Sequence, residues 1–377
     1  MSFETNASGR RPKWASRRIL GSVLGLAVVV GTAATAQATV HASAHGDGFY
    51  APPRSATASY NSNQYRDNDG HNYSSSSSSS SSNWNQGWTA GHRNWNDQWT
   101  WNGTGWNKYE FRTIGNSADP TFNQLLGIND RGTIVGYYGS GEDAQHPNQG
   151  YWTDSPYGQG NFRDENYPGS VQTQVIGITK HGDTAGFYVD DKGDNHGFVR
   201  WNGEWSEVNY PGSHFNQLLG INSAGIAVGF FNDAKGNAHG YTYNARTHAF
   251  VLIILPGRAT AITVTGINDR NQVVGFATIG KVTVGFIWTS RHAIVIIRLG
   301  NGTNTQILGI NNAGVVVGSF VDGHKRTHGF MKDNWRTRTI DAPHSASTVI
   351  NGLNNKGQIV GFYTDNEEHT LGFLAHS

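Results

Sequence analysis

The sequence predicts an all-β protein whose C-terminal part forms a six-bladed β-propeller, a closed ring of six short antiparallel sheets. Three observations indicate this fold class. The chain of 377 residues has 49 glycines and 12 tryptophans but only 15% charged residues, which is typical of turn-rich β structure. One sequence block recurs six times with a period typical of propellers. The first and last copies of this block are incomplete in complementary ways.

Residues 1–38 read as an export signal. A basic stretch from Arg10 to Arg18 precedes an apolar run from Ile19 to Ala36. Ala36-Gln37-Ala38 then supplies the small-x-small pattern that a signal peptidase recognises. We therefore expect the mature protein to begin near Ala38, after cleavage during export.

The alternative for the same segment is a retained membrane anchor. Its strongly apolar core, Ile19 to Val30, is about half of the roughly twenty residues that a membrane-spanning helix needs, so cleavage is favoured. The pair Arg17-Arg18 loosely resembles a twin-arginine signal, but the following residues fit that pattern poorly, which favours Sec-type export. We expect a secreted, extracellular protein that could be held at the cell surface. Membrane contact is expected only through an uncleaved signal.

Residues 39–96 read as a low-complexity linker. The segment contains a serine run from Ser74 to Ser82 and many Asn and Gln residues with few aliphatic ones, so it buries too little apolar surface to offset its ordering entropy. Spaced tryptophans run from this polar segment into the predicted domain and could stack on sugar rings. The favoured interpretation is that the segment is a tether and that the last of these tryptophans belong to the folded domain. These tryptophans are Trp84, Trp88, Trp95, Trp99, Trp101 and Trp106.

Charge and cysteine content exclude several classes of function. The formal net charge is +1, so the chain has no overall basic field for a phosphate backbone, and nucleic acid is not expected as a partner. The chain contains no cysteine, which excludes disulfides, thiolate nucleophiles and Cys-ligated metals. No cofactor is expected.

The repeated block has the form G-I-N-x-x-G-x-I-V-G. The steps between its first glycines are 50, 43, 46, 43 and 43 residues, and a period of about 40 to 50 is found in solenoids and propellers. These glycines are Gly127, Gly177, Gly220, Gly266, Gly309 and Gly352.

Each unit contains the signals of four strands. An apolar run ends in G-I-N, a tight turn follows, and an alternating run such as Thr133 to Gly136 forms a second strand. After a polar loop, an H-G-F motif opens a third strand, and segments such as Trp205 to Tyr210 or Arg338 to Ile340 form the fourth. Four short antiparallel strands per unit make a propeller blade.

The ends of the array predict how the ring closes. The sixth unit stops after its third strand, Leu371 to Leu374, and the missing fourth strand, Trp106 to Ile114, precedes the first unit. Pairing these two segments would remove free sheet edges, so residues 97–377 are predicted to form one propeller closed by an N-terminal strand. An open solenoid is the alternative. Trp101-Asn102-Gly103 also resembles Trp201-Asn202-Gly203, so a copy of a third strand could compete at this seam.

The motif G-I-N-x-x-G-x-I-V-G followed by H-G-F resembles the HAF-type bacterial extracellular repeat. The resemblance covers Trp106 to Ser377 in six tandem copies. It implies an extracellular location and a β-rich array, and it brings no catalytic residues, because the family has no established activity. The fourth unit departs from the pattern, with Val284 where other units carry His, and the first and sixth units also lack this His.

The loops between second and third strands carry the candidate ligand-binding residues. An Asp or a His recurs there at fixed distances from the glycine that ends the second strand: Asp190, Asp233, Asp322, Asp365, His196, His239 and His328. One interpretation is a ring of ligands for a metal or polar molecule over the channel. The favoured interpretation is structural, with each Asp capping its own loop and each His bonding to the next blade. No metal site is assigned.

Catalysis has weaker support than binding. The chain has no nucleophile elbow, metalloprotease helix or phosphate-binding loop. The non-repeating acids Glu142, Asp143, Glu367 and Glu368 are candidates for a paired-carboxylate site, which glycosidases need. We predict an exported, monomeric scaffold with a binding or surface-attachment role toward a glycan or surface protein, and no catalytic residue is assigned. A secreted glycan-active hydrolase is the alternative.

Overall fold

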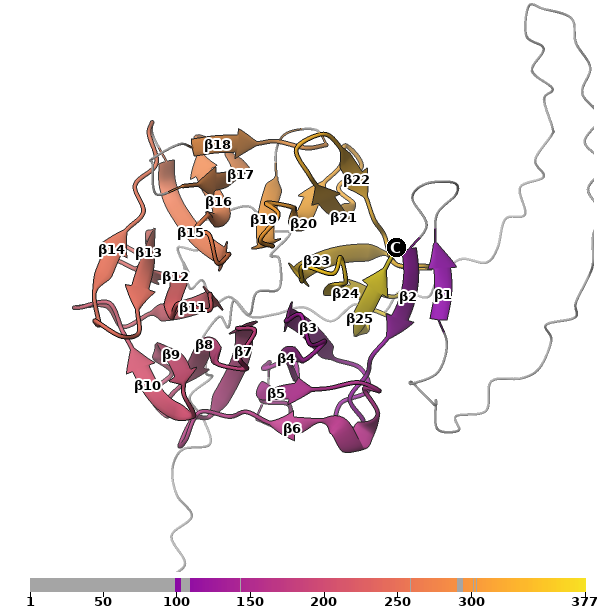
Figure 1. The fold of residues 1–377 in the computed structure, drawn as a ribbon, viewed down its shortest axis with the longest axis horizontal. Helices are drawn as coiled ribbons and strands as arrows, with labels where there is room; N and C mark the ends of the chain where they lie inside the picture. The colour runs from indigo at the N-terminus through magenta and orange to yellow at the C-terminus, as the bar shows by residue number, and fades with distance from the viewer. Residues whose placement is uncertain are drawn as a thin grey trace, which may run out of the picture. The chain divides into compact units, whose positions relative to one another are not determined.

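A computed structural model describes residues 99–102, 109–142, 144–257, 259–289, 294–300, 302 and 304–377. Within these residues, six antiparallel sheets surround a central channel, which confirms the predicted six-bladed propeller (Figure 1). The predicted signal, residues 1–38, and the linker, residues 39–96, lie outside the described residues. The described part of the chain contains no helix of the length and apolarity that crossing a membrane requires.

The strands of each blade are designated a to d from the channel outward. Blade 1 contains β3 (Asn123–Ile128), β4 (Ile134–Tyr138), β5 (Gln149–Thr153) and β6 (Arg163–Asp164), with the short 3-10 helix η2 (Gln159–Asn161) before β6. Blade 2 contains β7 (Gln172–Ile178), β8 (Thr184–Val189), β9 (Asn195–Trp201) and β10 (Glu204–Val208). Blade 3 contains β11 (Asn216–Ile221), β12 (Ile226–Asn232), β13 (Ala238–Asn244) and β14 (Phe250–Leu252).

The second half of the ring follows the same plan. Blade 4 contains β15 (Ala259–Ile267), β16 (Val273–Ile279), β17 (Val282–Trp288) and β18 (Ile294–Ile297). Blade 5 contains β19 (Thr305–Ile310), β20 (Val316–Val321), β21 (Thr327–Lys332) and β22 (Thr337–Thr339). Blade 6 contains β23 (Ser347–Leu353), β24 (Ile359–Thr364), β25 (Thr370–His376), β2 (Tyr109–Thr113) and β1 (Trp99–Asn102).

The N-terminal strand closes the ring as the sequence predicts. β2 pairs with β25 in antiparallel register, and Phe111 lies opposite Ala375. The Ile114 N–H extends this pairing by donating to the Gly372 carbonyl oxygen at 2.9 Å. Tyr109 and Phe111 are each only 3% exposed, so the strand also contributes to the core.

The last blade differs from the prediction in having a fifth strand. β1 pairs with β2 on the side away from β25, with Trp101 opposite Glu110. The segment that resembles a third strand therefore does not displace β25. Because β25 already occupies the inner edge of β2, the segment takes the outer edge, which would otherwise be unpaired.

A β-bulge lies in the innermost strand of every blade. In blade 1 the register shifts between Leu125 and Gly127, and the corresponding shift recurs in the other five blades. The extra residues of the first three blades, Leu126, Ile176 and Leu219, are buried in one cluster. The bulge thus gives each inner strand an additional residue for packing between blades.

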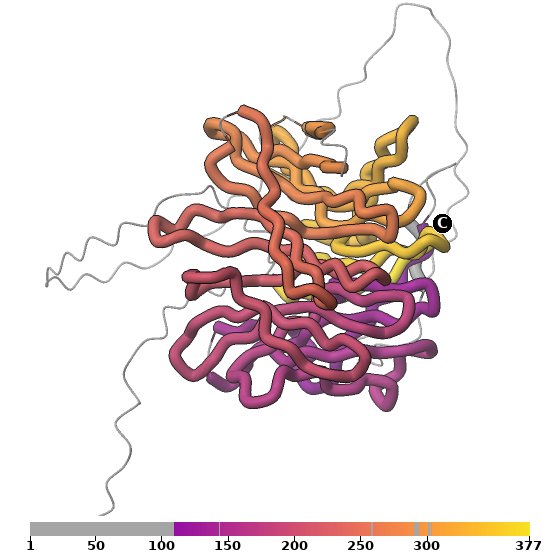
Figure 2. Tube along the Cα trace, turned by 60° about the vertical axis from the view of Figure 1, so that its left-hand side comes forward, coloured from indigo at the N-terminus to yellow at the C-terminus, as the bar shows by residue number. Residues whose placement is uncertain are grey.

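The repeated glycines allow neighbouring blades to approach closely. A Cβ on Gly177 would lie 2.8 Å from the Gly220 Cα, and one on Gly352 would lie 3.3 Å from the Gly127 Cα. At these separations an added methyl group would clash with backbone. Figure 2 shows the blades packed side by side along the ring.

Candidate functional site

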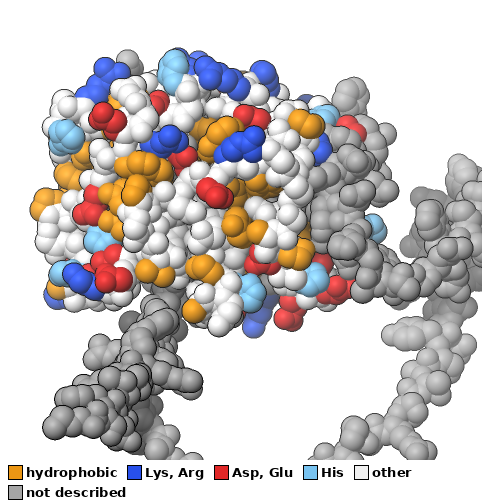
Figure 3. Space-filling view, turned by 90° about the horizontal axis from the view of Figure 1, so that it is seen from below, with side chains coloured by type: hydrophobic (Ala, Val, Ile, Leu, Met, Phe, Trp, Pro, Cys, Tyr) orange, Lys and Arg blue, Asp and Glu red, His pale blue; other side chains and the backbone are white. Residues whose placement is uncertain are grey.

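The predicted Asp and His residues lie on the face formed by the loops between strands b and c. Each Asp follows strand b, and three of the four loops place a His on strand c. This face also carries most of the described histidines, namely His146, His196, His214, His239, His324, His328, His344 and His369. In the side view of Figure 3, Lys and Arg side chains gather toward one rim, whereas Asp, Glu and His side chains are frequent toward the other.

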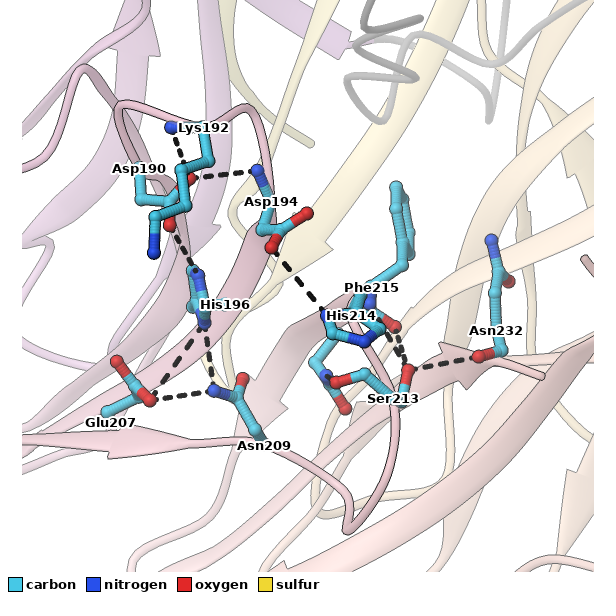
Figure 4. Close-up of polar contacts among 11 residues, drawn as sticks. Asp190, Lys192, Asp194, His196, Glu207, Asn209, Ser213, His214, Phe215 and Asn232 are labelled. Atoms are coloured by element: carbon cyan, nitrogen blue, oxygen red, sulfur yellow. Dashed lines mark hydrogen bonds and ion pairs between the residues drawn. The ribbon is translucent and has the colours of Figure 1, made fainter. Parts of the chain in front are cut away.

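The loop of blade 2 shows how these side chains are used. One oxygen of Asp190, Oδ1, accepts hydrogen bonds from the backbone N–H groups of Lys192 and Asp194, each at 2.9 Å (Figure 4). The other oxygen, Oδ2, lies 3.3 Å from His196 Nε2. On its second nitrogen, Nδ1, His196 accepts a 2.8 Å hydrogen bond from the amide of Asn209, the residue directly after strand d. Asp190 therefore caps its loop and orients the imidazole.

The same arrangement recurs in two further blades. Asp233 accepts from two backbone N–H groups of its loop and lies 3.0 Å from His239 Nε2. Asp322 accepts from the backbone N–H groups of His324 and Arg326 and lies 3.2 Å from His328 Nε2. An aromatic ring of strand b stacks on the imidazole in each blade, at 5.2 Å in blade 3 and 5.4 Å in blade 5.

In blade 6 the histidine is displaced along the loop. Asp365 caps its loop in the usual way, but its partner is His369, whose Nδ1 lies 3.1 Å from the Asp365 carboxylate. Glu367 lies 3.6 Å from the same nitrogen. One potential ligand atom from each of these three side chains lies within 4.8 Å of the others, a spacing that could hold a cation.

These contacts decide one part of the structural interpretation. Each Asp caps its own loop as expected, but the expectation that each His bonds to the next blade is wrong. The imidazoles of His196 and His328 contact Asn209 and Asp341, which follow strand d of the same blade. The reason is geometric, because strand d lies directly beside strand c in the same sheet.

The electrostatics of these loops favour charged carboxylates. Burial raises the pKa of Asp190, but backbone hydrogen bonds and His196 outweigh burial and hold the pKa below its usual value. The backbone N–H of Arg326 is the largest of the contributions that lower the pKa of Asp322 to about 2. A general acid needs a raised pKa, so these groups are suited to holding structure rather than to donating protons.

The remaining candidate acids that the structure describes lie on the b–c loops of two blades. Glu142 lies in the b–c loop of blade 1 and is exposed, and Asp143 lies outside the described residues. Glu367 and Glu368 lie in the b–c loop of blade 6, where both are exposed.

The opposite face, formed by the a–b and c–d turns, is organised by hydrogen bonds that join neighbouring blades at five of the six boundaries. We call it the turn belt: it consists of the residue that ends each G-I-N motif and the residue after it. In blade 4, Asn268 Oδ1 accepts from the N–H groups of Arg270 and Gln272, and its amide donates to the Asn311 carbonyl of blade 5 at 2.9 Å. The residues that end the motifs are Asn129, Thr179, Asn222, Asn268, Asn311 and Asn354.

The turn belt surrounds the mouth of the central channel. The cavity at this mouth has a volume of only about 80 Å³ and is lined by belt residues of all six blades. Hydrogen bonds from Asn312 and Ser223 and the nearby charge of Lys180 outweigh burial, which is the largest single influence, and lower the pKa of Asp269. The mouth is thus narrow and polar, and the belt residues that line it hydrogen-bond to one another.

A larger cleft of about 620 Å³ lies on the same face, between blades 2 and 3. It is lined by the a–b turn of blade 2, the c–d turn of blade 2 and one residue from each of the corresponding turns of blade 3. Its principal side chains are His181, Asp183, Arg200, Trp201, Ser223 and Arg246.

None of the site residues predicted from the sequence lines this cleft. Two sequence signals mark it. The block of blade 2 has Thr179-Lys180 where the other five have Asn followed by Asp, Ser or Asn, and Trp201-Asn202-Gly203 places an aromatic residue at the turn. Its lining comes from residues that only the stacking of two blades brings together.

The chain was compared with protein-family models, curated proteins and solved structures. No protein-family model and no curated protein matches the chain. Among solved structures, the chain is similar to TolB from Acinetobacter baumannii, with a TM-score of 0.47 and 8% identity over 66% of this chain and 65% of TolB. It is also similar to a virginiamycin B lyase from Staphylococcus aureus, with a TM-score of 0.41 and 10% identity over 71% of this chain and 99% of the lyase. For AofleA from Arthrobotrys oligospora, the TM-score is 0.41 and the identity 9%, over 70% and 81% of the two chains. At these identities the likeness concerns the fold alone.

Proposed function

We propose that this β-propeller is an exported binding protein whose ligand is a glycan, held in the cleft between blades 2 and 3. The observation that carries the proposal is the lining of that cleft. An indole ring, two guanidinium groups and an imidazole converge there on short turns of a rigid scaffold. Aromatic rings stack on the apolar faces of sugars, and guanidinium groups donate to their oxygens.

The size of the cleft favours a glycan over the other predicted partner, a surface protein. Its volume of about 620 Å³ falls within the range of roughly 300–1,000 Å³ that is typical of small-molecule sites. A stable protein partner buries about 800 Å² of each surface, usually over a flatter region. One or two sugar units therefore match the cleft better.

Binding is also favoured over the alternative of glycoside hydrolysis. Glycosidases use two carboxyl groups roughly 5–10 Å apart, and one of them must be able to donate a proton. Among the described residues that line the cleft, Asp183 is the one carboxylate. Its Oδ1 accepts from the Asn202 N–H and its Oδ2 from the Thr179 hydroxyl, so both oxygens already serve the turn.

Export and attachment to a surface belong to the same proposal. The signal in residues 1–38, with cleavage near Ala38, and the resemblance to the HAF-type extracellular repeat both support it. Mass spectrometry of the N-terminus of protein from the culture supernatant tests this part. An intact Met1 in the membrane fraction would contradict it.

A glycan array combined with a panel of chromogenic glycosides tests the binding role. We expect the mature full-length protein to retain a subset of glycans on the array and to hydrolyse none of the glycosides. Turnover of any glycoside would favour the hydrolase. Failure to bind any glycan, with the protein folded, would reject the proposed ligand class.

A further inference from the structure

The cleft lies at the blade boundary where the repeat departs from its own pattern. Five of the six residues that end the G-I-N motifs are asparagines, and each donates its side-chain amide to a carbonyl of the next blade, at 2.9 to 3.3 Å. Threonine has no amide, and the Thr179 hydroxyl donates to Asp183 of its own turn instead. Within the described residues, no hydrogen bond of the turn belt joins blade 2 to blade 3.

The second position of the belt is also different here. Ser223, Asp269, Asn312 and Asn355 each donate a backbone N–H to the side chain of the next blade, at 2.8 to 2.9 Å. In blade 2 this position is Lys180, whose side chain offers no acceptor to blade 1 and whose backbone N–H forms no such contact with blade 3 among the described residues. In the described part of the chain, both contacts of the turn belt are thus missing between blades 2 and 3, where the cleft lies. A feature repeated in every blade serves the scaffold, whereas a single departure is expected at a functional site.

The acidic groups near the cleft already have partners. Arg200 Nη1 lies 2.7 Å from Glu165, whose side chain is 2% exposed and also accepts from the Thr184 hydroxyl. Asp183 is held by its own turn, as described above. Arg246 is exposed, and its guanidinium forms no ion pair with any described residue. Within the described lining, Arg246 is therefore the cationic group left for a ligand.

Trp201 provides a platform beside that charge. Its six-membered ring lies against Gly225 of blade 3, where a Cβ would come within 3.1 Å of the ring. Gly225 has a φ of +80°, a conformation that suits glycine, so the close contact and the turn both require this residue. The Arg246 guanidinium lies over the indole, with its Cζ 5.7 Å from the ring centroid. This cation–π contact is exposed and therefore weak enough for a ligand to replace.

From this arrangement we infer that the cleft binds an acidic saccharide, a sugar that carries a carboxylate. The pyranose ring stacks on Trp201, and its carboxylate forms a bidentate ion pair with Arg246. His181 adds a hydrogen-bonding imidazole at the edge of the same site. The inference rests on the proposed glycan-binding function and names the class of glycan.

Tetragalacturonate and its methyl ester are matched probes, because esterification removes the charge of the carboxyl groups and leaves the sugar chain unchanged. Calorimetric titration of the full-length mature protein is expected to show binding of the acid at least about tenfold tighter than that of the ester, since one charge-assisted hydrogen-bond pair is removed. Arg246→Gln is expected to weaken binding of the acid by a similar factor and to abolish the preference. Arg270→Gln, an exposed arginine on the a–b turn of blade 4, is the control and should leave both affinities unchanged.

A second variant separates stacking from charge. Trp201→Ala is expected to weaken the binding of the acid and of the ester by similar factors. Trp201 also packs against the core between blades 2 and 3, so the thermal unfolding of the variant protein is measured in parallel. If this variant does not fold, Arg246→Gln decides the matter, because that side chain is exposed.

The outcomes distinguish this inference from the proposed function. Equal binding of acid and ester, or binding that Arg246→Gln leaves unchanged, would overturn the acidic-saccharide assignment while glycan binding stands. Retention of neutral glycans alone on the array would have the same meaning. If neither probe binds and the array is also blank, the proposed function fails and the inference fails with it.

Discussion

The side-chain amide of Asn354, in the last blade, donates a 3.0 Å hydrogen bond to the backbone carbonyl oxygen of Asn129, in the first blade. The two residues are 225 positions apart in the chain. Asn355 reinforces the contact, because its backbone N–H donates to Asp130 at 2.8 Å. The ring is therefore closed at two distances from the central channel. The turn belt closes it at the channel, and the pairing of β2 with β25 closes it farther out.

Removing the N-terminal strand should destabilise the ring. A variant that begins at Thr121 lacks β2, so β25 loses its partner and the core loses the buried side chains of Tyr109 and Phe111. We expect it to aggregate or to melt far below a variant that begins at Asn94, as measured by differential scanning calorimetry and light scattering. Deleting the serine run from Ser74 to Ser82 is the control. An equally stable, monomeric Thr121 variant would contradict closure.

Restoring the missing asparagine should stabilise the protein. In Thr179→Asn, the amide oxygen can accept the two N–H groups that Thr179 Oγ1 now accepts, from His181 and Asp183. The amide nitrogen can then donate to the Asn222 carbonyl. We expect a gain of about 0.5–1.5 kcal/mol in the free energy of unfolding, the usual net contribution of one hydrogen bond. Urea unfolding measures it, and a loss of stability would show that blade 2 does not follow the geometry of its neighbours.

Close packing of the inner strands makes their glycines sensitive to any side chain. In Gly309→Ala, the new methyl group would lie 2.8 Å from the Asn351 carbonyl oxygen and 3.3 Å from the Gly352 Cα. We expect the free energy of unfolding to fall by about 1–3 kcal/mol, as for other overpacked cores. Gly160→Ala, where nothing lies within 4 Å, is the matched control and should change stability little. Equal effects of the two substitutions would argue against tight inter-blade contact.

The recurring Asp–His loops should affect stability more than ligand binding. Asp190→Ala removes the acceptor for two backbone N–H groups and the partner of His196. We expect the melting temperature to fall by a few degrees while glycan affinity stays within twofold of wild type, about the limit of the titration. If the affinity were lost and stability kept, the interpretation of these residues as ligand-binding would be the better one.

The loop of blade 5 should make stability depend on pH. Burial lowers the pKa of His328, but hydrogen bonds to Asp341 and Asp322 outweigh burial and raise it above its usual value. Protonation is thus favoured in the folded state, so this contribution is complete below the unfolded pKa of about 6.5 and is lost as pH rises through the folded pKa. Asp341→Asn should therefore destabilise more at about pH 5.5 than at about pH 8.5.

Chemical denaturation at the two pH values measures this difference, and NMR titration of His328 reports its pKa directly. The reverse dependence would mean that the imidazole is held neutral. Asp322 acts with the opposite sign, because its lowered pKa gives stability that is present above the unfolded pKa of about 3.9 and lost in acid.

Local patterns in the sequence were sufficient for much of the fold. The six G-I-N blocks predict six blades. Each blade can be recognised because its strands and tight turns are marked by alternating apolar residues and turn residues within short segments. The complementary ends, Trp106 to Ile114 and Leu371 to Leu374, predict the closing pair, which the register of Phe111 with Ala375 confirms. The Asp caps of the b–c loops were also predictable, since an Asp accepts backbone N–H groups within a few residues of itself.

Only the tertiary structure decides features that join residues distant in the chain. The partners of His196 and His328, the outer position of β1 and the turn belt all depend on which strands lie beside one another in space. The cleft depends on this most strongly, because Trp201 and Arg246 belong to different blades and meet only when the two blades pack. Sequence patterns describe each blade from local propensity and turn chemistry, whereas the surface between blades arises from packing that no single repeat contains.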